Sequence, residues 1–269
     1  MPEGDTLFRA ARALDRALRG KVIERFESAY PALTRERLEG RVVEGVSAVG
    51  KHLLMRLSGG LVVRTHLRMN GAWHLYRPDE RWRKARSRAR LVLATGDFVA
   101  VGFDVPEAEL LREEDLPHSV VGRLGPDLLA PEFDSEEALR RLQARPGEEV
   151  GQVLLDQTVM AGVGNEYKSE LLFICRIHPR STVGAVAPAD LKKLIAKARE
   201  LLVRNVAEPM RGPGRWTTQS ADPSRRVYVY GRTGRPCPRC GTPIAWSRQG
   251  SQARSSWWCP RCQPLQQTT

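Results

Sequence analysis

The residues at the extreme N-terminus could carry out covalent chemistry. The chain begins Met1-Pro2-Glu3, and removal of the initiator methionine would leave Pro2 with a free secondary amine. An α-amino group has a pKa near 8, so a useful fraction of it is neutral and nucleophilic at pH 7. Such an amine attacks carbonyl-like carbons to give Schiff bases, and Glu3 follows directly to transfer protons. The alternative is that both residues merely precede a helix, because proline and acidic residues are favoured at helix starts.

Four cysteines near the other end of the chain have the spacing of a metal site. Cys237 and Cys240 form one Cys-x-x-Cys pair, Cys259 and Cys262 form a second, and 18 residues separate the pairs. Both thiolates of such a pair reach one tetrahedral ion, so the pattern predicts one structural zinc ion with no open coordination position. Two disulfides or two redox pairs are the alternatives, and an intracellular location disfavours both. The fifth cysteine, Cys175, lies in an apolar helical run and is expected in a core.

The overall charge indicates a polyanionic partner. The 269-residue chain carries 43 Lys and Arg against 31 Asp and Glu, which gives a net charge of +12 and a pI near 10.0. This excess favours nucleic acid ahead of an acidic membrane surface. No apolar run approaches the length of a membrane span, and the N-terminus lacks the hydrophobic segment of a signal peptide. The sequence predicts a monomeric, soluble, cytoplasmic protein without a membrane partner, associated with the nucleoid if the source is bacterial.

Two kinds of periodicity divide the chain. Residues 5–19 show the apolar spacing of a helix that ends at Gly20. Residues 21–103 contain short β-rich runs separated by turn signals, which predict a β-sandwich or barrel. The predicted strands are 22–26, 41–43, 52–57, 61–63, 72–76, 90–93 and 98–101. Six basic residues in ten lie between two of these strands, at 81–90, where they form either a solvated loop or a phosphate contact.

The second half of the chain is predicted to be helical. Asp134 and Glu137 form a capping box at the start of one helix. The helices expected after it cover 148–157, the stretch from the glycine turn to 176, and 189–207. The glycine turn, Gly162-Val163-Gly164-Asn165, lies between two of these helices. Its backbone N–H groups and the Asn165 amide could bind phosphate, although most such turns are only turns.

Several short motifs occur in an order that resembles the formamidopyrimidine-DNA glycosylase/endonuclease VIII family. They are Pro2-Glu3-Gly4, Gly50-Lys51-His52-Leu53-Leu54, Leu154-Leu155-Asp156-Gln157 before the glycine turn, and Tyr230-Gly231-Arg232 before the four cysteines. The resemblance spans nearly the whole chain and implies an α+β multidomain fold. The implied parts are an N-terminal β-sandwich with a helix at 1–112, a linker at 113–129, a helix–two-turn–helix domain at 130–225 and a zinc finger at 226–269.

The resemblance also implies an activity. It describes a bifunctional DNA glycosylase/AP lyase of base excision repair, which removes oxidised bases from damaged DNA and cleaves the strand by β,δ-elimination. Pro2 resembles the Schiff-base nucleophile, Glu3 the catalytic carboxylate and Lys51 a catalytic lysine that contacts phosphate beside the lesion. The implied DNA-binding residues are Lys51, His66, Met69, Asn165, Arg232 and Arg254. Met69 lies where the family inserts a wedge into the base stack, although a methionine there could equally be a core residue.

Two departures from the family pattern bear on specificity. Asp5-Thr6 stands where the family commonly has Pro-Glu, so a second acidic residue is shifted or lost. The branch that acts on purine lesions carries an Asp-Pro-Arg-Arg-Phe-Gly loop, whereas this chain has Val101-Gly102-Phe103-Asp104-Val105-Pro106 in about that place. The missing loop favours the endonuclease VIII branch and oxidised pyrimidines. The alternatives are an oxidised-purine (8-oxoguanine or formamidopyrimidine) glycosylase of the same family and a non-enzymatic zinc-ribbon DNA-binding protein.

Overall fold

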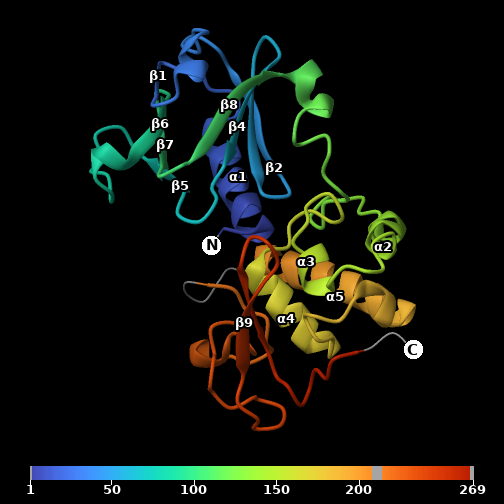
Figure 1. Cartoon of the computed structure of the whole chain (residues 1–269). Coiled ribbons are helices and arrows are strands. Elements are labelled where there is room, and N and C mark those ends of the chain that lie inside the picture. The colour runs from blue at the N-terminus through green and yellow to red at the C-terminus, as the bar shows by residue number, and fades with distance from the viewer. Residues whose placement is uncertain (1, 208–213, 267–269) are drawn as a thin grey trace. The chain divides into compact units, whose positions relative to one another are not determined.

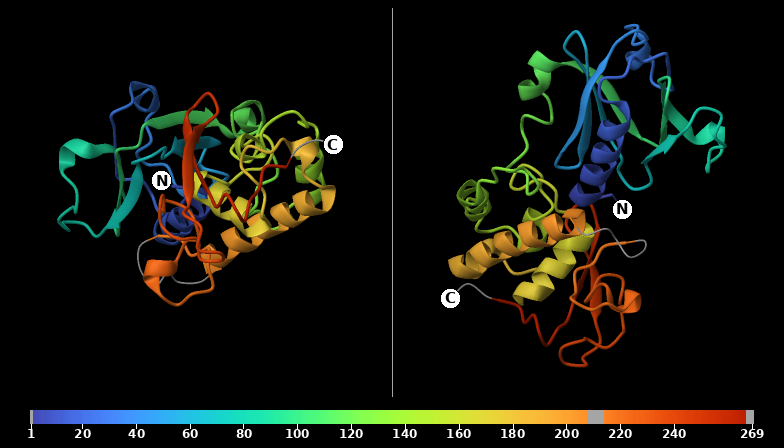
Figure 2. Two further views of the ribbon diagram at one scale, coloured as in Figure 1. Left: turned by 60° about the horizontal axis from the view of Figure 1, so that its bottom comes forward. Right: turned by 180° about the vertical axis from the view of Figure 1, so that it is seen from behind.

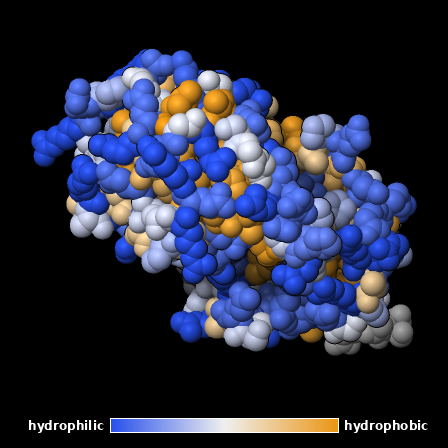
Figure 3. Space-filling model, turned by 90° about the horizontal axis from the view of Figure 1, so that it is seen from above, coloured by the Kyte–Doolittle hydropathy of each residue, from blue (hydrophilic) through white to orange (hydrophobic). Residues whose placement is uncertain are grey.

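The chain divides into two compact units, residues 1–123 and 124–269, each with its own hydrophobic core (Figure 1). The structure is a computed structural model and describes residues 2–207 and 214–266. The division between the units falls inside the stretch 113–129 that the sequence marks as a linker. Hydrophilic residues cover most of the face shown in Figure 3. Over the described ranges, none of the helices combines the length and apolarity needed to cross a bilayer.

The first unit is a β-sandwich of two four-stranded antiparallel sheets, as predicted. One sheet has the strand order β2-β3-β4-β8 and the other β1-β6-β7-β5. Inward side chains of both sheets share one core with the first helix. The strands are β1 Arg25–Ser28, β2 Val43–Val49, β3 His52–Leu57, β4 Leu61–His66, β5 Ala72–Tyr76, β6 Ala89–Ala94, β7 Val99–Phe103 and β8 Glu107–Arg112. The short 3-10 helices of this unit are η1 Pro31–Thr34, η2 Arg86–Arg88 and η3 Glu113–His118.

Helix α1, Gly4–Leu18, fixes the N-terminus of the chain against this core. Its apolar face, which includes Leu7, Leu14 and Leu18, is buried among the strands, and Figure 2 (right) shows the helix running alongside them. The helix ends before Gly20, whose φ of 76° is in the left-handed region that glycine adopts without strain. The predicted helix is therefore confirmed, and it holds the first residues in a defined place.

Two predicted strands of this unit lie at the wrong positions, and one observed strand was not predicted. The run 22–26 gives β1 only from Arg25, and the predicted strand 41–43 lies almost entirely before β2. Residues Val22 and Val42 meet only in an isolated bridge. Strand β8 was not predicted, because its alternating charges resemble a linker. It lies at the edge of its sheet, where charged side chains are ordinary and protect the edge from further pairing.

The second unit is built from helices followed by a two-stranded hairpin. The helices are α2 Ser135–Gln143, α3 Val150–Val153, α4 Asn165–Cys175 and α5 Pro188–Ala207, with short 3-10 turns η4 Val183–Ala185 and η5 Pro223–Arg225. Strands β9 Ala245–Gln249 and β10 Arg254–Trp258 form the hairpin. Helix α4 is buried on almost every side, and α5 packs along it (Figure 1).

The helix prediction in this unit holds at α2, α4 and α5 and fails at α3. The carboxylate of Asp134 caps α2 by accepting the Glu137 N–H at 2.9 Å, which is one half of the predicted capping box, while the Glu137 carboxylate accepts from Arg140 and Arg141. The predicted helix 148–157 is wrong, because α3 has only four residues. The chain turns after it because the Asp156 carboxylate accepts the Thr158 N–H at 2.9 Å, an alternative to continuing the helix.

Candidate functional site

Pro2 and Glu3 lie immediately before helix α1. Glu3 is its N-cap residue, and the Glu3 carbonyl accepts the N–H groups of Thr6 and Leu7 at 3.0 and 3.2 Å. The Glu3 side chain is fully buried, whereas Pro2 is partly exposed. If the only role of Glu3 were a favourable interaction with the helix dipole, its side chain would be expected on the surface, exposed to solvent. If Met1 is removed, a buried carboxylate directly after the N-terminal nitrogen would suit proton transfer at that nitrogen. Met1 lies outside the described residues, so its removal stays a prediction.

Lys51 and His66 lie at the same end of the sheet β2-β3-β4-β8. Gly50 and Lys51 form the two-residue turn between β2 and β3, and Gly50 supplies the positive φ, 56°, that such hairpin turns require. His52 follows Lys51 and pairs across the strands with His66, the last residue of β4. The two imidazole rings are 4.9 Å apart. The β2–β3 turn and the register of β3 with β4 therefore bring Lys51 and His66, two of the predicted DNA-binding residues, to one end of the sheet.

Hydrogen bonds fix both imidazoles in their neutral form. The Arg64 guanidinium donates to His52 Nδ1 at 2.8 Å, and the Arg68 N–H donates to His66 Nδ1 at 3.1 Å. An Nδ1 that accepts a hydrogen bond carries no proton, so each ring keeps its hydrogen on Nε2. Burial lowers the pKa of His52 to about 3 and that of His66 to about 4, and nearby cationic groups, including Lys51, add to the effect. At neutral pH, His66 therefore offers a ligand an uncharged N–H donor.

We expect the buried histidine to make the protein less stable as the pH falls from 7 to 5. The unfolded chain binds a proton on His52 near pH 6.5, whereas the folded chain resists protonation until about pH 3. The contribution of His52 to the free energy of unfolding is therefore fully present above about pH 6.5, and about 2 kcal/mol of that free energy is lost by pH 5. Urea unfolding at both pH values should show this loss reduced in His52→Gln and unchanged in His118→Gln, a control on an exposed histidine. Equal pH dependence of the wild type and His52→Gln would contradict the assignment.

The turn after β4 presents Met69 to solvent. The Gly71 N–H donates to the Leu67 carbonyl at 2.9 Å, and a Cβ at position 71 would lie 2.7 Å from that oxygen, so only glycine closes this turn. Met69 at its tip is 56% exposed, which excludes the alternative of a core residue. An exposed, flexible apolar side chain is what insertion into a base stack requires. Insertion itself stays a prediction.

In the second unit, Asn165 is the first residue of α4. The turn before it is held by Gln157, whose Oε1 accepts the Gly162 N–H at 3.0 Å and whose Nε2 donates to the Val163 carbonyl at 3.1 Å. The Asn165 side chain is buried, and its Oδ1 has no hydrogen-bond partner within residues 2–207 and 214–266. The backbone N–H groups of a helix start suit an anionic ligand, whereas the unpaired Oδ1 is an acceptor that would be satisfied by a hydrogen-bond donor.

The two arginines that the resemblance implies have different surroundings. Arg254 opens β10, and its Nε and Nη2 donate to the neutral Gln252 Oε1 at 3.2 and 3.1 Å, which leaves its positive charge available to a phosphate. Arg232 instead donates to the carbonyls of Val227 and Pro236 at 3.2 and 3.1 Å. Arg232 thus holds the segment that enters the finger, and its contact with DNA stays a prediction.

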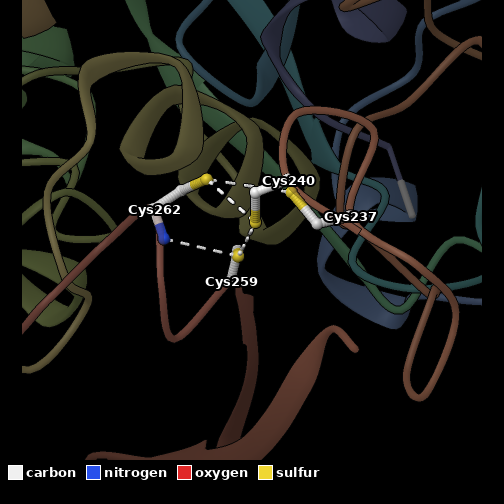
Figure 4. Close-up of side chains that lie close together, drawn as sticks. All are labelled: Cys237, Cys240, Cys259 and Cys262. Atoms are coloured by element: carbon white, nitrogen blue, oxygen red, sulfur yellow. Dashed lines mark hydrogen bonds between the residues drawn. The ribbon is translucent and has the colours of Figure 1, made fainter. Parts of the chain in front are cut away.

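The four paired cysteines converge on one point (Figure 4). Their sulfur atoms all lie within 4.8 Å of one another. The Cys240 and Cys259 sulfurs are 3.4 Å apart, and those of Cys237 and Cys262 are 3.9 Å apart. Sulfurs at 2.3 Å from a tetrahedral zinc ion are separated by about 3.8 Å. The Cys262 N–H also donates to the Cys259 sulfur at 3.4 Å, a contact that favours the thiolate. The donor set therefore fits a closed, four-coordinate metal site.

Comparisons with known proteins match both units. The formamidopyrimidine-DNA glycosylase N-terminal domain matches residues 1–103, and the H2TH domain of formamidopyrimidine-DNA glycosylase matches residues 124–212. The protein named "Probable endonuclease 8 2" of Streptomyces coelicolor is 42% identical over 266 residues, covering 98% of this chain and 94% of that protein. The chain belongs to the formamidopyrimidine-DNA glycosylase/endonuclease VIII family. The DNA-(apurinic or apyrimidinic site) lyase Nei2 of Mycolicibacterium smegmatis is 40% identical over 267 residues, covering 98% of this chain and 99% of that protein.

Solved structures of the same family share the fold. MutM bound to DNA containing carbocyclic 8-oxo-G has a TM-score of 0.83 and 25% identity, and the match covers 98% of this chain and 100% of that chain. Lactococcus lactis Fpg bound to DNA containing an oxidised pyrimidine has a TM-score of 0.82, 26% identity and the same coverage. The predicted α+β fold and the prediction of a DNA-repair enzyme are therefore confirmed. The non-enzymatic alternative does not agree with this family membership.

Sequence reasoning missed two buried charged residues on α4 of this glycosylase-family chain. The fully buried Lys168 donates from Nζ to the Ser255 carbonyl at 3.0 Å and to Ser256 Oγ at 2.7 Å. Lys168 thereby ties α4, which begins with Asn165, to the strand that begins with Arg254. Lys168 and Arg254 also line one cavity of about 450 Å³. Helix α4 therefore connects the two predicted phosphate-binding residues of this unit: Asn165 is its first residue, and its Lys168 holds the strand that begins with Arg254.

The second buried residue, Glu170, holds the segment before the finger. Its Oε1 accepts the N–H groups of Val229 and Tyr230, both at 2.8 Å. Its Oε2 accepts the Tyr228 N–H at 2.7 Å and the Thr217 hydroxyl. All four partners are donors, so this position requires a side chain that only accepts hydrogen bonds. The sequence held no clear signal for either residue, because the first half of α4 is polar and its charged residues resemble those of an exposed helical turn.

We expect Glu170→Gln to destabilise the second unit by about 1–3 kcal/mol, because the new NH₂ group would face two donors and leave buried groups unsatisfied. Thermal unfolding followed by circular dichroism measures the change. Glu200→Gln is the matched control, since that side chain is 53% exposed and its removal should cost less than about 0.5 kcal/mol. Equal effects of the two substitutions would show that the Glu170 carboxylate does not hold the segment.

Arg254→Ala should weaken binding to damaged and undamaged DNA alike and flatten the salt dependence of binding by about one unit, because one phosphate contact is lost. Lys192→Ala on α5 removes the same charge from an exposed side chain and should change the slope much less. Titrations of both variants at several salt concentrations measure the two slopes. A loss confined to one lesion would indicate instead that Arg254 reads the base.

Proposed function

We propose that this family member removes oxidised pyrimidines from DNA by Schiff-base chemistry at Pro2 and cleaves the strand by β,δ-elimination. The observation that carries the proposal is the buried Glu3 carboxylate next to Pro2 at the start of α1. The names of the relatives support it, since one is an endonuclease 8 and another a DNA-(apurinic or apyrimidinic site) lyase. Damaged DNA is the partner, and solved neighbours of the chain hold abasic-site DNA.

The chemistry begins once the target nucleotide has left the base stack, which costs a few kcal/mol and least for a damaged base. The neutral Pro2 nitrogen attacks the sugar C1′, the bond from C1′ to the base breaks, and the departing base takes a proton from water. Glu3 accepts the proton that the Pro2 nitrogen loses and delivers it to the ring oxygen, so the sugar opens to an iminium ion on Pro2. The positive end of the α1 dipole favours the neutral amine in the free enzyme.

Strand cleavage follows from the same iminium. It acidifies the C2′ hydrogen, and loss of that proton expels the 3′ phosphate. Loss of the C4′ hydrogen as a proton expels the 5′ phosphate in a second elimination, and water then hydrolyses the iminium and restores the Pro2 amine. Lys51, with the neutral His66 donor at the same sheet end, would hold a flanking phosphate during these steps. Met69 would fill the space that the flipped base leaves.

Zinc is the metal that we assign to the four cysteines. Four thiolates suit Zn²⁺, leave no coordination position for an activated water and therefore give the ion a structural role. Residues Cys237, Cys240, Cys259 and Cys262 would hold it. The ion would stabilise the finger that carries Arg254, and the base-removal steps are assigned to the Pro2 amine and the Glu3 carboxylate.

A second candidate is removal of oxidised purines by the same chemistry. The solved neighbours favour it, because they include enzymes bound to DNA with 8-oxo-G and with Fapy-dG. A panel of duplexes, each with one defined lesion, separates the two. Faster cutting at thymine glycol and 5-hydroxycytosine than at 8-oxoguanine and formamidopyrimidine supports the pyrimidine assignment, and the reverse order assigns the chain to purine lesions.

A further inference from the structure

The connection from β5 to β6, residues 77–88, is strongly basic, and none of the steps proposed above uses it (Figure 1). Together with the start of β6 it forms the stretch 77–90, which holds seven basic and two acidic residues. Sequence alone allows two interpretations of this stretch, a solvated loop or a phosphate contact. The packing of the connection and the register of the strands on either side of it favour the phosphate contact.

Aromatic packing fixes this connection on the face of the sheet that points away from the main core. The Trp82 ring stacks on Tyr76 of β5, with 6.1 Å between the ring centroids, and meets Phe103 of β7 edge-on at 5.8 Å. The Tyr76 hydroxyl also accepts the Arg83 N–H at 3.1 Å. A loop that only carried solvated charge would need none of these contacts. The connection is therefore ordered in advance, which lowers the entropic cost of binding a ligand there.

Three exposed arginines lie on this anchored connection. Arg81 and Arg83 flank the half-buried Trp82, and over the described ranges of the chain neither forms an ion pair or a side-chain hydrogen bond. Arg86 is 70% exposed, and its guanidinium lies 5.2 Å from the centre of the Trp82 ring. Its contact with Glu27 at 3.4 Å is open to solvent and therefore weak. The three positive charges are thus available to an anionic partner.

Strand register places the end of the connection beside the turn that presents Met69. Ala72, the first residue of β5, pairs with Phe103, and Phe103 pairs with Ala89, the first residue of β6. The starts of β5 and β6 therefore lie at one end of the sheet, and Met69 precedes β5 by three residues. Arg83 precedes Ala89 by six residues, which span at most about 20 Å. This length corresponds to about six base pairs of duplex, at about 3.4 Å each.

We propose that Arg81, Arg83 and Arg86, here called the basic strip, bind the phosphate backbone of the duplex that flanks the lesion, outside the base pair opened at Met69. Guanidinium groups on an ordered segment suit phosphate oxygens. Phosphate contacts carry no sequence information, so the basic strip should add affinity for any duplex that is long enough to reach it. The proposal rests on the proposed function, because it takes damaged DNA as the partner.

Binding to duplexes of different length tests the proposal without requiring catalysis. Each duplex contains one non-cleavable tetrahydrofuran abasic analogue, with about 15 base pairs on both sides or with one side shortened to about three. The double variant Arg81→Gln/Arg83→Gln should bind the long duplex about tenfold more weakly at about 0.1 M salt, with the salt slope reduced by about two units, because two phosphate contacts are lost. The difference from the wild type should disappear when one side is shortened and persist when the other side is shortened.

The double variant Arg35→Gln/Arg37→Gln is the matched control. Both side chains are exposed, and in the part of the chain that the structure describes neither forms an ion pair or a side-chain hydrogen bond. The Arg37 carbonyl accepts from Arg41, which also donates to the Ser58 carbonyl in the turn after β3, at the opposite end of that strand from Lys51. The control removes the same charge away from the Met69 turn and should stay within about twofold of wild-type affinity on every duplex.

The outcomes separate this proposal from the proposed function. A basic-strip variant that matches the wild type on every duplex, or that loses affinity equally on all of them, overturns the proposal even if the enzyme cuts damaged DNA normally. Unchanged DNA binding together with lost binding to phosphatidylglycerol vesicles would assign the strip to an anionic membrane and overturn it as well. A loss that depends on duplex length, in a protein that never forms a covalent link at Pro2, supports the strip and refutes the catalytic assignment.

Discussion

Glu3→Gln should lower the rate of base excision by about 10²–10⁴-fold while leaving affinity for damaged DNA nearly unchanged. Glutamine preserves the size of the buried side chain and removes its ability to donate and accept a proton. Single-turnover cutting of a lesion duplex gives the rate, and a titration with the abasic analogue gives the affinity. Circular dichroism checks that the variant folds, because the carboxylate is fully buried.

Glu44→Gln is the matched control for that prediction. Glu44 is exposed on β2 of the same unit, so the same chemical change there should leave the rate within about twofold of the wild type. A Glu3→Gln enzyme that excises at the wild-type rate would remove Glu3 from the mechanism. A variant that loses rate and affinity in equal measure would show that Glu3 supports folding or binding only.

Removal of the metal should unfold the finger and abolish tight DNA binding. The core of the finger is small: apart from the cysteines it comprises chiefly Phe173, Val229 and Ile244. So few apolar side chains cannot stabilise a hairpin without a metal, and the binding free energy of a structural zinc ion is about 10–16 kcal/mol. Metal analysis should give about one zinc per chain. Cys259→Ser should lose the zinc, the ordered hairpin and the contact made by Arg254.

Cys175→Ala provides the control for the cysteine substitution. Cys175 is buried in α4, burial raises the pKa of its thiol to about 11, and it lies outside the four-sulfur cluster. That variant should keep one zinc per chain and bind DNA normally, as expected of a core thiol. A metal-free wild-type preparation that binds DNA with undiminished affinity would contradict the structural role of zinc.

The features that sequence alone predicted are those with strong local causes. Helix α1 has a regular apolar face and a glycine at its end, and Asp134 caps α2 through its own side chain. The cysteine spacing determines the ligand set without reference to the rest of the fold. Strand β8 was missed because its stability comes from pairing with β4 and not from its own composition. Helix α3 was predicted too long because periodicity does not reveal the competing bonds of Asp156.

The parts of the site that lie in short sequence motifs could be predicted. The parts that depend on contacts between distant segments could not. Gly50-Lys51 and the glycine turn before Asn165 could be read from the chain. That His52 faces His66 follows from the register of β3 and β4, which no local pattern specifies. Glu170 gains its role from hydrogen bonds to a segment distant in the sequence. Most of the features that could not be predicted therefore depend on strand register or on hydrogen bonds between segments that are distant in the sequence.

Covalent trapping is the measurement that tests the central claim most directly. If Pro2 is the nucleophile, its nitrogen must be free, because an amide nitrogen has a delocalised lone pair and cannot form a Schiff base. The mature protein should therefore start at Pro2, and borohydride added during reaction with a duplex containing an oxidised pyrimidine should trap a complex whose link maps to Pro2. A link on Lys51 or another side chain would show that the nucleophile is wrongly assigned. A protein starting at Pro2 that neither traps nor cuts any lesion or abasic site would contradict the account as a whole.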